Sequence, residues 1–317
     1  MKALSFPKAI TFYLESRRRL GFALESEGAL LENLVEYAQE FHHRGPLTTD
    51  LALNWAQVPP PLDPMRRARR LEAVRHFALF WRAFDARTQI PPSGLFGPAY
   101  RRVPVHIFTG QEIAALLAAA QQLPPTEGLR PRTFGTLLGL LTCTGLRISE
   151  ALSLQLEDWE ATQAVLTIRQ AKFGQSRQVP LAPSAAAALR TYLRARTKAF
   201  PQSHARALFL NGEGQPLSYR EASGTFATLR DQLRWQQKRP RPRLHDLRHT
   251  FTVACLLGWY RQGQEELNAK ILSLAVYLGH RNIRHTYWYL TAVPELLALG
   301  SARWAKALAG QKGAVRE

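Results

Sequence analysis

The segment RLHDLRHT carries side chains that could act on a phosphate group. His245, Arg248 and His249 stand at positions i, i+3 and i+4, so on a helix they share one face. The apolar run from Phe251 to Trp259 follows directly and could anchor that helix in a core. A guanidinium can neutralise phosphoryl oxygens, and an imidazole can donate hydrogen bonds to them. The segment therefore predicts one half of a phosphoryl-transfer site.

A second segment, LAVYLGHRNIRHTYWYL, adds a histidine and two tyrosines. Gly279 closes a helical pattern, which is a usual place for a helix to stop, and His280 follows it. A phenol can attack phosphorus, so either Tyr287 or Tyr289 could be a nucleophile. On a helix these two side chains point about 200° apart, so both can hardly reach one phosphate. Tyr289 begins an apolar stripe that continues through Val293, which favours Tyr289.

The segment TGLRISE holds a further arginine. Gly145 permits a sharp turn after a buried helix, and Arg147 is expected in the first turn of the next helix. Glu150, three residues on, could orient the guanidinium of Arg147. An Arg–Glu pair at this spacing is usually an ordinary surface ion pair. Here it lies between apolar segments, where an unpaired cation is costly, so a functional role is favoured.

Composition and charge indicate a globular protein that binds a polyanion. The 317 residues are enough for two domains, and 46% are hydrophobic. The chain has 42 Lys+Arg against 24 Asp+Glu, a formal charge of +18, which points to nucleic acid. A generally basic, non-binding protein is the alternative. Cys143 and Cys255 stand in apolar contexts and are expected to be buried thiols. With no visible signal peptide or membrane-length apolar run, we expect a cytoplasmic protein.

Residues 1–95 are predicted to form a small helical domain of four helices. The fourth opens at Asp63-Pro64, and its expected core stripe is Leu71, Val74, Phe77, Trp81 and Phe84. Around that stripe stand six arginines: Arg66, Arg67, Arg69, Arg70, Arg75 and Arg82. Such a run can be a solvated face, but arginines with little neighbouring acid favour contact with the DNA backbone. Residues 96–105 are the expected linker. The predicted DNA contacts are Arg66, Arg67 and Arg70, with Arg101 and Arg102 in the linker.

Residues 106–317 are predicted to form a second, mainly helical domain with a small β element. Thr109 and Glu112 have the spacing of a capping box, which indicates that a helix starts there. Residues 165–168 and 177–181 alternate like strands and are expected to pair as an antiparallel hairpin. Helices are expected at about 184–199 and 220–235. The predicted fold class is therefore mainly α with a small antiparallel β element, in two domains.

Five motifs occur in one order: TGLRISE, a lysine in the hairpin before RQVPL, HDLRH, LGH, and a tyrosine nine residues later. Together they resemble the tyrosine recombinase (phage integrase) family over residues 106–292. The resemblance implies a C-shaped clamp around duplex DNA, built from a helical core-binding domain and an α/β catalytic domain. Residues 1–95 are similar to the core-binding domain in size, helicity and position.

The resemblance also implies a role for each motif residue. Tyr289 attacks the scissile phosphate and forms a 3′-phosphotyrosyl link, while Arg147 and Arg248 hold the non-bridging oxygens. Lys172 protonates the leaving 5′ oxygen, and His245 and His280 stabilise the phosphate or shuttle protons. Glu150 supports the arginine, and His249 is expected to be more structural.

No cofactor or metal is expected. Fixed arginines and histidines can take over the task of a metal ion, and no clustered carboxylates are visible to hold Mg²⁺. The phosphotyrosyl bond conserves energy, so ATP is not needed, and no GxxxxGK[ST] loop occurs. The expected partners are double-stranded DNA and further copies of the chain, as a tetramer on DNA, with related recombinases as possible co-members. The expected location is the cytoplasm, in association with the nucleoid, with no membrane contact.

Several alternatives remain open from the sequence. The favoured function is site-specific breakage and rejoining of DNA for integration or transposition of a mobile element. A type IB topoisomerase-like enzyme shares the chemistry, and a DNA-binding accessory subunit could keep the fold while depending on partners. A small-molecule enzyme is disfavoured by the charge. At residue level, His245 and His249 could be packing histidines, Lys172 a solvated turn lysine and His280 a helix cap.

Overall fold

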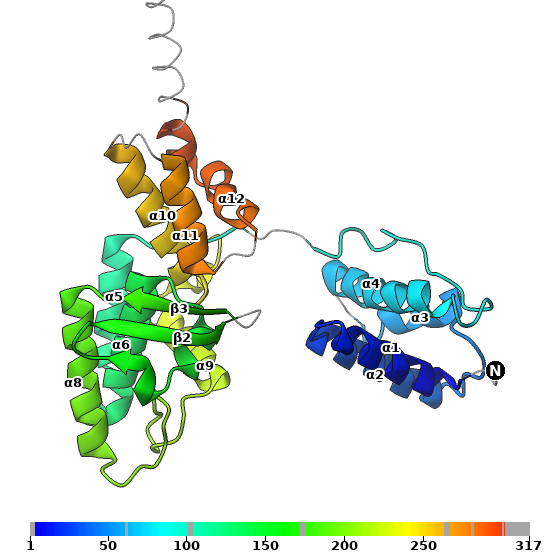
Figure 1. The fold of residues 1–317 in the computed structure, drawn as a ribbon, viewed down its shortest axis with the longest axis horizontal. Helices are drawn as coiled ribbons and strands as arrows, with labels where there is room; N and C mark the ends of the chain where they lie inside the picture. Colours follow the sequence, from blue (N-terminus) through cyan, green and yellow to red (C-terminus); the bar gives the residue numbers. More distant parts are fainter. Residues whose placement is uncertain are drawn as a thin grey trace, which may run out of the picture. The chain divides into compact units, whose positions relative to one another are not determined.

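The structure is a computed structural model that describes residues 4–60, 63–100, 104–171, 175–262, 267–279, 282–299 and 301. The chain divides into two compact units, residues 1–103 and 104–317. The division falls inside the predicted linker, 96–105. The fold is mainly helical with one small antiparallel sheet, so the predicted fold class is confirmed (Figure 1).

The first unit consists of four helices in its described part: α1 (Phe6–Arg19), α2 (Glu25–Glu40), α3 (Thr49–Ala56) and α4 (Pro64–Trp81). The Thr48 side chain caps α3 by accepting from the Leu51 N–H at 3.2 Å, and Asp63 caps α4. Trp55 and Phe77 are fully buried in the core between the helices. Four of the five residues predicted for the α4 stripe are buried, but Phe84 is 53% exposed because α4 ends at Trp81.

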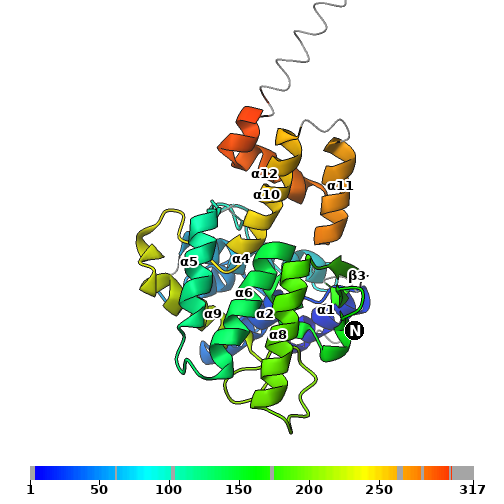
Figure 2. The same cartoon turned by 90° about the vertical axis from the view of Figure 1, so that its left-hand side faces the viewer.

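The second unit begins with four helical segments. They are α5 (Gly110–Gln121), α6 (Leu129–Thr144), the short α7 (Ile148–Ser153) and η1 (Leu156–Asp158). The predicted capping box is confirmed: Thr109 accepts from the N–H of Glu112 at 3.2 Å, and the Glu112 carboxylate accepts from the N–H of Thr109 at 2.8 Å. Helices α5, α6 and α8 (Pro183–Ala199) lie side by side (Figures 1 and 2).

A three-stranded antiparallel sheet of order β1-β2-β3 follows η1. Its strands are β1 (Trp159–Glu160), β2 (Val165–Ala171) and β3 (Gln175–Pro180). The predicted hairpin is confirmed, since Leu166 pairs with Val179 and Ile168 with Arg177. Leu166, Ile168 and Val179 are almost fully buried in the main core of the unit.

The rest of the unit is helical in its described part. It comprises α9 (Tyr219–Gln232), η2 (Trp235–Gln237), α10 (Asp246–Arg261), α11 (Leu267–Leu278) and α12 (Arg284–Ala292). Helices α10, α11 and α12 gather at one end of the unit around a second core, which includes Val253, Leu274 and Tyr289 (Figures 1 and 2). Helix α10 contacts both α6 and α11, so it connects this second core to the main one.

Two features of composition have a structural outcome. The prediction of two buried thiols is wrong, because Cys143 is exposed and Cys255 is half-buried. Burial raises the pKa of the Cys255 thiol to about 11. None of the helices in the described part of the chain has the length and apolar character that a membrane span requires.

Candidate active site

Arg147 is positioned by the turn between α6 and α7. Gly145 ends α6 with a left-handed φ of +63°, and a Cβ there would collide with the ring of Phe251. The chain turns sharply at this glycine, and Arg147 becomes the N-cap residue of α7. The expected place in the first helical turn was therefore wrong by one residue. The side chain of Arg147 is 22% exposed, so its guanidinium is held by protein while part of it stays accessible.

One carboxylate fixes Arg147. Glu150 accepts from Arg147 Nη1 at 2.7 Å and from the Arg147 main-chain N–H at 2.9 Å. The Arg147 Nη2 donates to the carbonyl of Gly279 at 2.9 Å, which ties α7 to the end of α11. Burial would raise the pKa of Glu150, but hydrogen bonds from Arg177 and Arg147 lower it to about 2. Glu150 is thus ionised at neutral pH.

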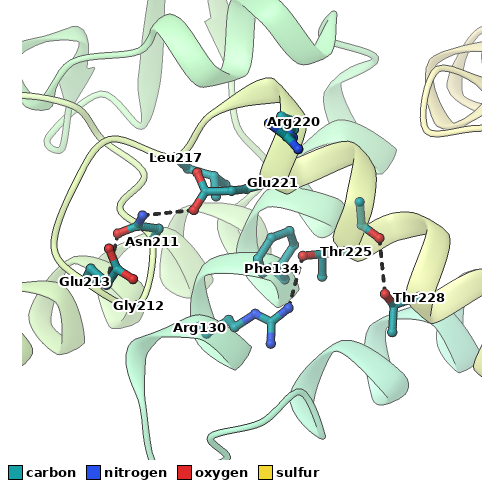
Figure 3. A pocket seen from close by; sticks show the side chains of 11 residues that line it. Arg130, Phe134, Asn211, Gly212, Glu213, Leu217, Arg220, Glu221, Thr225 and Thr228 are labelled. Atoms are coloured by element: carbon teal, nitrogen blue, oxygen red, sulfur yellow. Dashed lines mark hydrogen bonds between the residues drawn. The ribbon is translucent and has the colours of Figure 1, made fainter.

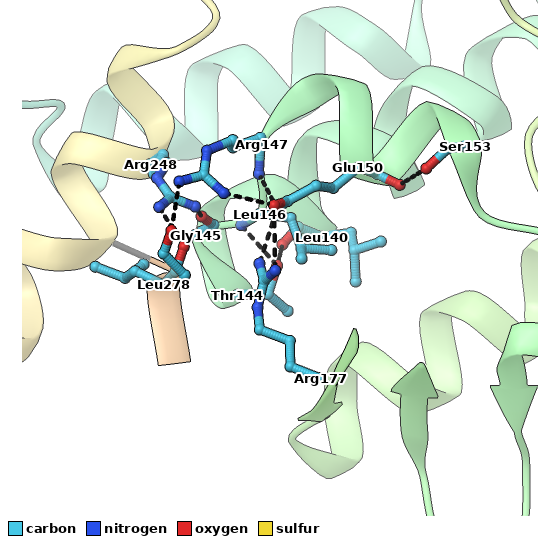
Figure 4. Close-up of polar contacts among 11 residues, drawn as sticks. Leu140, Thr144, Gly145, Leu146, Arg147, Glu150, Ser153, Arg177, Arg248 and Leu278 are labelled. Atoms are coloured by element: carbon cyan, nitrogen blue, oxygen red, sulfur yellow. Dashed lines mark hydrogen bonds and ion pairs between the residues drawn. The ribbon is translucent and has the colours of Figure 1, made fainter. Parts of the chain in front are cut away.

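Arg248 lies on the first turn of α10 and is only 2% exposed. Its Nη1 donates to the carbonyl of Gly145 at 2.8 Å, and its Nη2 to the carbonyl of Leu278 at 2.6 Å (Figure 4). These carbonyls stand at the C-terminal ends of α6 and α11, where main-chain oxygens lack helical donors. Burial, and then the charge of Arg147, lower the pKa of Arg248 to about 10. The site therefore holds a guanidinium whose charge an anion would stabilise.

His249 and Tyr289 meet across 40 residues of sequence. The Nδ1 of His249 lies 2.5 Å from the phenol oxygen of Tyr289. Tyr289 is 2% exposed, whereas Tyr287 is 39% exposed on the same helix. The rings of His249 and Trp288 both pack near the Tyr289 ring. The residue expected to be more structural is thus a direct hydrogen-bond partner of the phenol.

His245 precedes α10 and packs edge-on against His249, with ring centroids 4.8 Å apart. Desolvation by the surrounding protein, and then the positive charges of Arg248 and Arg147, lower the pKa of His245 to about 4. His245 is therefore neutral at neutral pH. A neutral imidazole can accept a proton as well as donate a hydrogen bond.

Four predicted residues lie outside the described part of the chain: Lys172, His280, Arg101 and Arg102. Among the residues that are described, no group of three or more His, Cys, Asp or Glu side chains could hold a metal ion.

The arginines of α4 differ in what they contact. Arg66 is exposed. Arg70 instead packs its guanidinium 4.0 Å from the Trp55 ring centroid and donates to the carbonyl of Val58 at 2.5 Å. The guanidinium of Arg67 lies 5.7 Å from the ring centroid of Phe96. Of the three predicted contacts on α4, Arg66 is thus the exposed one, and Arg70 is committed to its own unit.

Sequence reasoning missed Arg177 as a site residue. Arg177 lies on β3, is 14% exposed, and donates to both oxygens of Glu150. In the sequence Arg177 is only one of several basic residues of the predicted hairpin. Its partner is 27 positions away, so neither helical nor strand periodicity could reveal the contact.

A cavity of about 580 Å³ lies elsewhere in the same unit (Figure 3). It is lined by α9, the N-terminal part of α6 and the 211–217 loop, including Arg130, Phe134 and Glu221. None of the predicted site residues lines it. The candidate active site is therefore the arginine cluster and not this cavity.

The comparisons with known proteins agree with this geometry. The model of the phage integrase family matches residues 106–295. The chain is 40% identical over 302 residues to the integrase/recombinase y4rB of Sinorhizobium fredii, covering 92% of this chain and 95% of that protein. The chain belongs to the phage integrase family. These proteins are the tyrosine recombinases, a family of site-specific DNA recombinases, so the recognition made from the motifs is confirmed.

Two further comparisons show how far the likeness extends. The tyrosine recombinase XerD of Caulobacter vibrioides is 30% identical, over 75% of this chain and 74% of that protein. The solved Tn1549 transposon integrase in complex with transposon right end DNA is 18% identical with a TM-score of 0.65, covering 92% of this chain and 95% of that chain. The second likeness concerns the fold.

Proposed function

We propose that this chain cuts and rejoins duplex DNA at specific sites through a 3′-phosphotyrosyl intermediate. One observation carries the proposal: α10 presents Arg248 to the carbonyls beside Arg147, and on its next position presents His249 to the phenol of Tyr289. The two arginines and the phenol thus lie in the same small region, which supports their use as phosphate-binding cations and nucleophile. The family membership supports the same chemistry.

In the proposed reaction, the oxygen of Tyr289 attacks the scissile phosphorus while the bond to the 5′ oxygen breaks. A free phenol has a pKa near 10, so the Tyr289 proton must leave as the bond forms, and His249 Nδ1 is placed to accept it. Arg147 and Arg248 stabilise the added negative charge on the non-bridging oxygens, because their guanidiniums are already fixed by protein acceptors. His245 and His280 assist there, and Lys172 gives its proton to the leaving oxygen.

We further propose the biological setting and the assembly. The likeness to an integrase/recombinase supports integration or transposition of a mobile element. Exchange between two duplexes breaks four strands, and each chain offers one such tyrosine, so four copies are needed on paired sites. These copies would act on chromosomal DNA in the cytoplasm.

A nicked duplex that traps the covalent intermediate tests the proposal. Purified chain should become linked to the 3′ end of the cut strand, and nuclease mapping of the attached end would show this. A plasmid assay then separates the possible outcomes, because a recombinase joins two sites, whereas a topoisomerase-like enzyme relaxes supercoils without pairing them. Attachment to a 5′ end, or no attachment on verified sites, would contradict the proposal.

The burial of Tyr289 favours a second candidate function, a subunit whose catalysis depends on partners. With 2% of the side chain exposed, the phenol cannot reach a phosphate unless α12 moves. This second function holds if the purified chain binds a site without forming the adduct, and if addition of a related recombinase from the same element restores adduct formation.

A further inference from the structure

The β2–β3 hairpin reaches the arginine cluster through Arg177. The Nη1 of Arg177 donates to Glu150 Oε1 at 3.1 Å, and its Nη2 donates to Glu150 Oε2 at 2.8 Å (Figure 4). This is a two-point contact between a planar guanidinium and a planar carboxylate, which fixes orientation as well as distance. The side chains of Arg177 and Glu150 are 14% and 5% exposed, so water competes little for the bonds.

Glu150 is shared between two guanidiniums. Each of its oxygens accepts one hydrogen bond from Arg177 and one from Arg147. Two like charges this close would repel each other without the carboxylate between them. The orientation of the Arg147 guanidinium therefore depends on where Arg177 holds Glu150.

The same two arginines also lie against the end of α11. A Cβ built on Gly279 would stand 3.4 Å from Nη1 of Arg147 and 3.4 Å from Nη1 of Arg177. The neighbouring carbonyl of Leu278 holds Arg248. A displacement of Arg177 would thus disturb the packing of all three guanidiniums against the C-terminal end of α11.

We infer that Arg177 is a positioning residue for the proposed cleavage, holding Arg147 through Glu150 and making the arginine clamp depend on the place of the β2–β3 hairpin. The inference rests on the proposed function. The segment between β2 and β3 contains Lys172, the proposed acid. Arg177 would then make the position of Arg147 depend on the two strands that the Lys172 segment connects.

The first test compares Arg177→Gln, Glu150→Gln, the double variant, and Arg169→Gln as a matched control. Arg169 lies on β2 and pairs with Asp158 at 2.5 Å, so the control removes another arginine–carboxylate pair, more exposed and made by one hydrogen bond, from the same sheet. Single-turnover adduct formation on saturated nicked duplex should fall on the order of 10- to 100-fold in Arg177→Gln and stay unchanged in Arg169→Gln. Adduct formation by the double variant should be no slower than by Glu150→Gln, because both changes break the same linkage from Arg177 through Glu150 to Arg147.

Two measurements separate positioning from general damage. Arg177→Lys keeps the charge but can reach only one oxygen of Glu150 at a time, so it should recover part of the rate. It also serves as a control in case Arg177→Gln fails to fold. The pH profile should also change. Without Arg177 the pKa of Glu150 rises, so adduct formation should fall as the pH drops from neutral toward about 4.3, the ordinary value for glutamate. Thermal denaturation at each pH separates this change from general destabilisation, because in a merely destabilised protein adduct formation falls only together with the folded fraction.

The possible failures can be told apart. If wild-type chain forms no adduct on verified sites, the proposed function falls and the inference falls with it. If wild type forms the adduct and Arg177→Gln matches Arg169→Gln in rate, the inference alone is overturned. It is also overturned if the loss in the double variant is the product of the two single losses, because Arg177 would then act independently of Glu150.

Discussion

At the scale of single residues, the two clamp arginines are held by different acceptors. Among the described residues, Arg147 has the Glu150 carboxylate and the carbonyl of Gly279, whereas Arg248 has the carbonyls of Gly145 and Leu278. The planar guanidinium of Arg248 reaches both carbonyls, one with Nη1 and the other with Nη2. A lysine ammonium is a point charge and cannot bridge acceptors on two helices. Charge alone is therefore insufficient at position 248.

Arg248→Lys tests this reasoning. We expect the rate of adduct formation on a nicked duplex to fall on the order of 10²- to 10³-fold, because a fixed hydrogen-bond donor to the negatively charged transition state is lost. The affinity for DNA should change little. Arg261→Lys is the control, since Arg261 lies on the same helix in an exposed pair with Glu295. Equal rates for the two variants would show that position 248 needs only a positive charge.

His245 gives the chain a pH-dependent stability. Its pKa is about 4 in the folded chain and about 6.5 in an unfolded one, so between these values the unfolded state binds the extra proton. Stability should therefore fall as the pH drops from about 6.5 to about 4. Thermal denaturation of wild type and His245→Asn over this window checks the sign. If the variant loses as much stability as wild type, His245 is not the group responsible.

At the scale of elements, the site is assembled from helix ends. The C-terminal carbonyls of α6 and α11 hold Arg248, the N-terminus of α7 presents Arg147, and the start of α10 presents His245. Gly145 is the element boundary on which most depends, because its left-handed turn both frees a carbonyl and lets α10 approach through Phe251.

Gly145→Ala should damage both the fold and the site. The left-handed φ alone costs about 1–2 kcal/mol for a residue with a Cβ, and the collision with Phe251 adds to this. Gly139→Ala on the same helix is the control: its Cβ would meet only Leu117 at 4.0 Å, so it should stabilise by up to about 1 kcal/mol. Thermal denaturation and adduct assays of the two variants check this. A stable, active Gly145→Ala chain would contradict the role given to the turn.

Much of the element order could be predicted from the sequence because its signals are local. The Thr109–Glu112 capping box and the 165–181 hairpin depend on neighbours within a few residues, and both are confirmed. Strand β1 was missed because Trp159–Glu160 is too short to show alternation. Phe84 was placed in the core because helical periodicity does not reveal that α4 ends at Trp81.

The contacts that complete the site were not predictable in this way. Arg177 meets Glu150, and His249 meets Tyr289, only after distant segments have folded together. The arginine run on α4 shows the same limit. Its charge was visible, but the commitment of Arg70 to Trp55 and Val58 requires the packing of two helices and a loop.

At the scale of the whole molecule, the formal charge of +18 predicts salt-dependent DNA binding. Arg66 and Arg70 should contribute differently, although they are four residues apart. Arg66→Ala should lower the magnitude of the slope of log affinity against log salt by about 0.9, the value for one lost phosphate contact. Arg70→Ala should leave the slope unchanged and destabilise the chain by about 1–3 kcal/mol. Binding titrations across salt concentrations, with thermal denaturation, check both; the reverse pattern would make Arg70 the DNA contact.

The identity of the nucleophile is the central claim, and covalent trapping tests it most directly. Wild type, Tyr289→Phe and Tyr287→Phe should be incubated with labelled nicked duplex in excess EDTA and resolved on denaturing gels. We expect an adduct with wild type and with Tyr287→Phe, because the Tyr289 phenol lies 2.5 Å from His249 Nδ1, while Tyr287 is 39% exposed on α12. Tyr289→Phe should bind the duplex and form no adduct. An adduct that survives in Tyr289→Phe and vanishes in Tyr287→Phe would contradict the account.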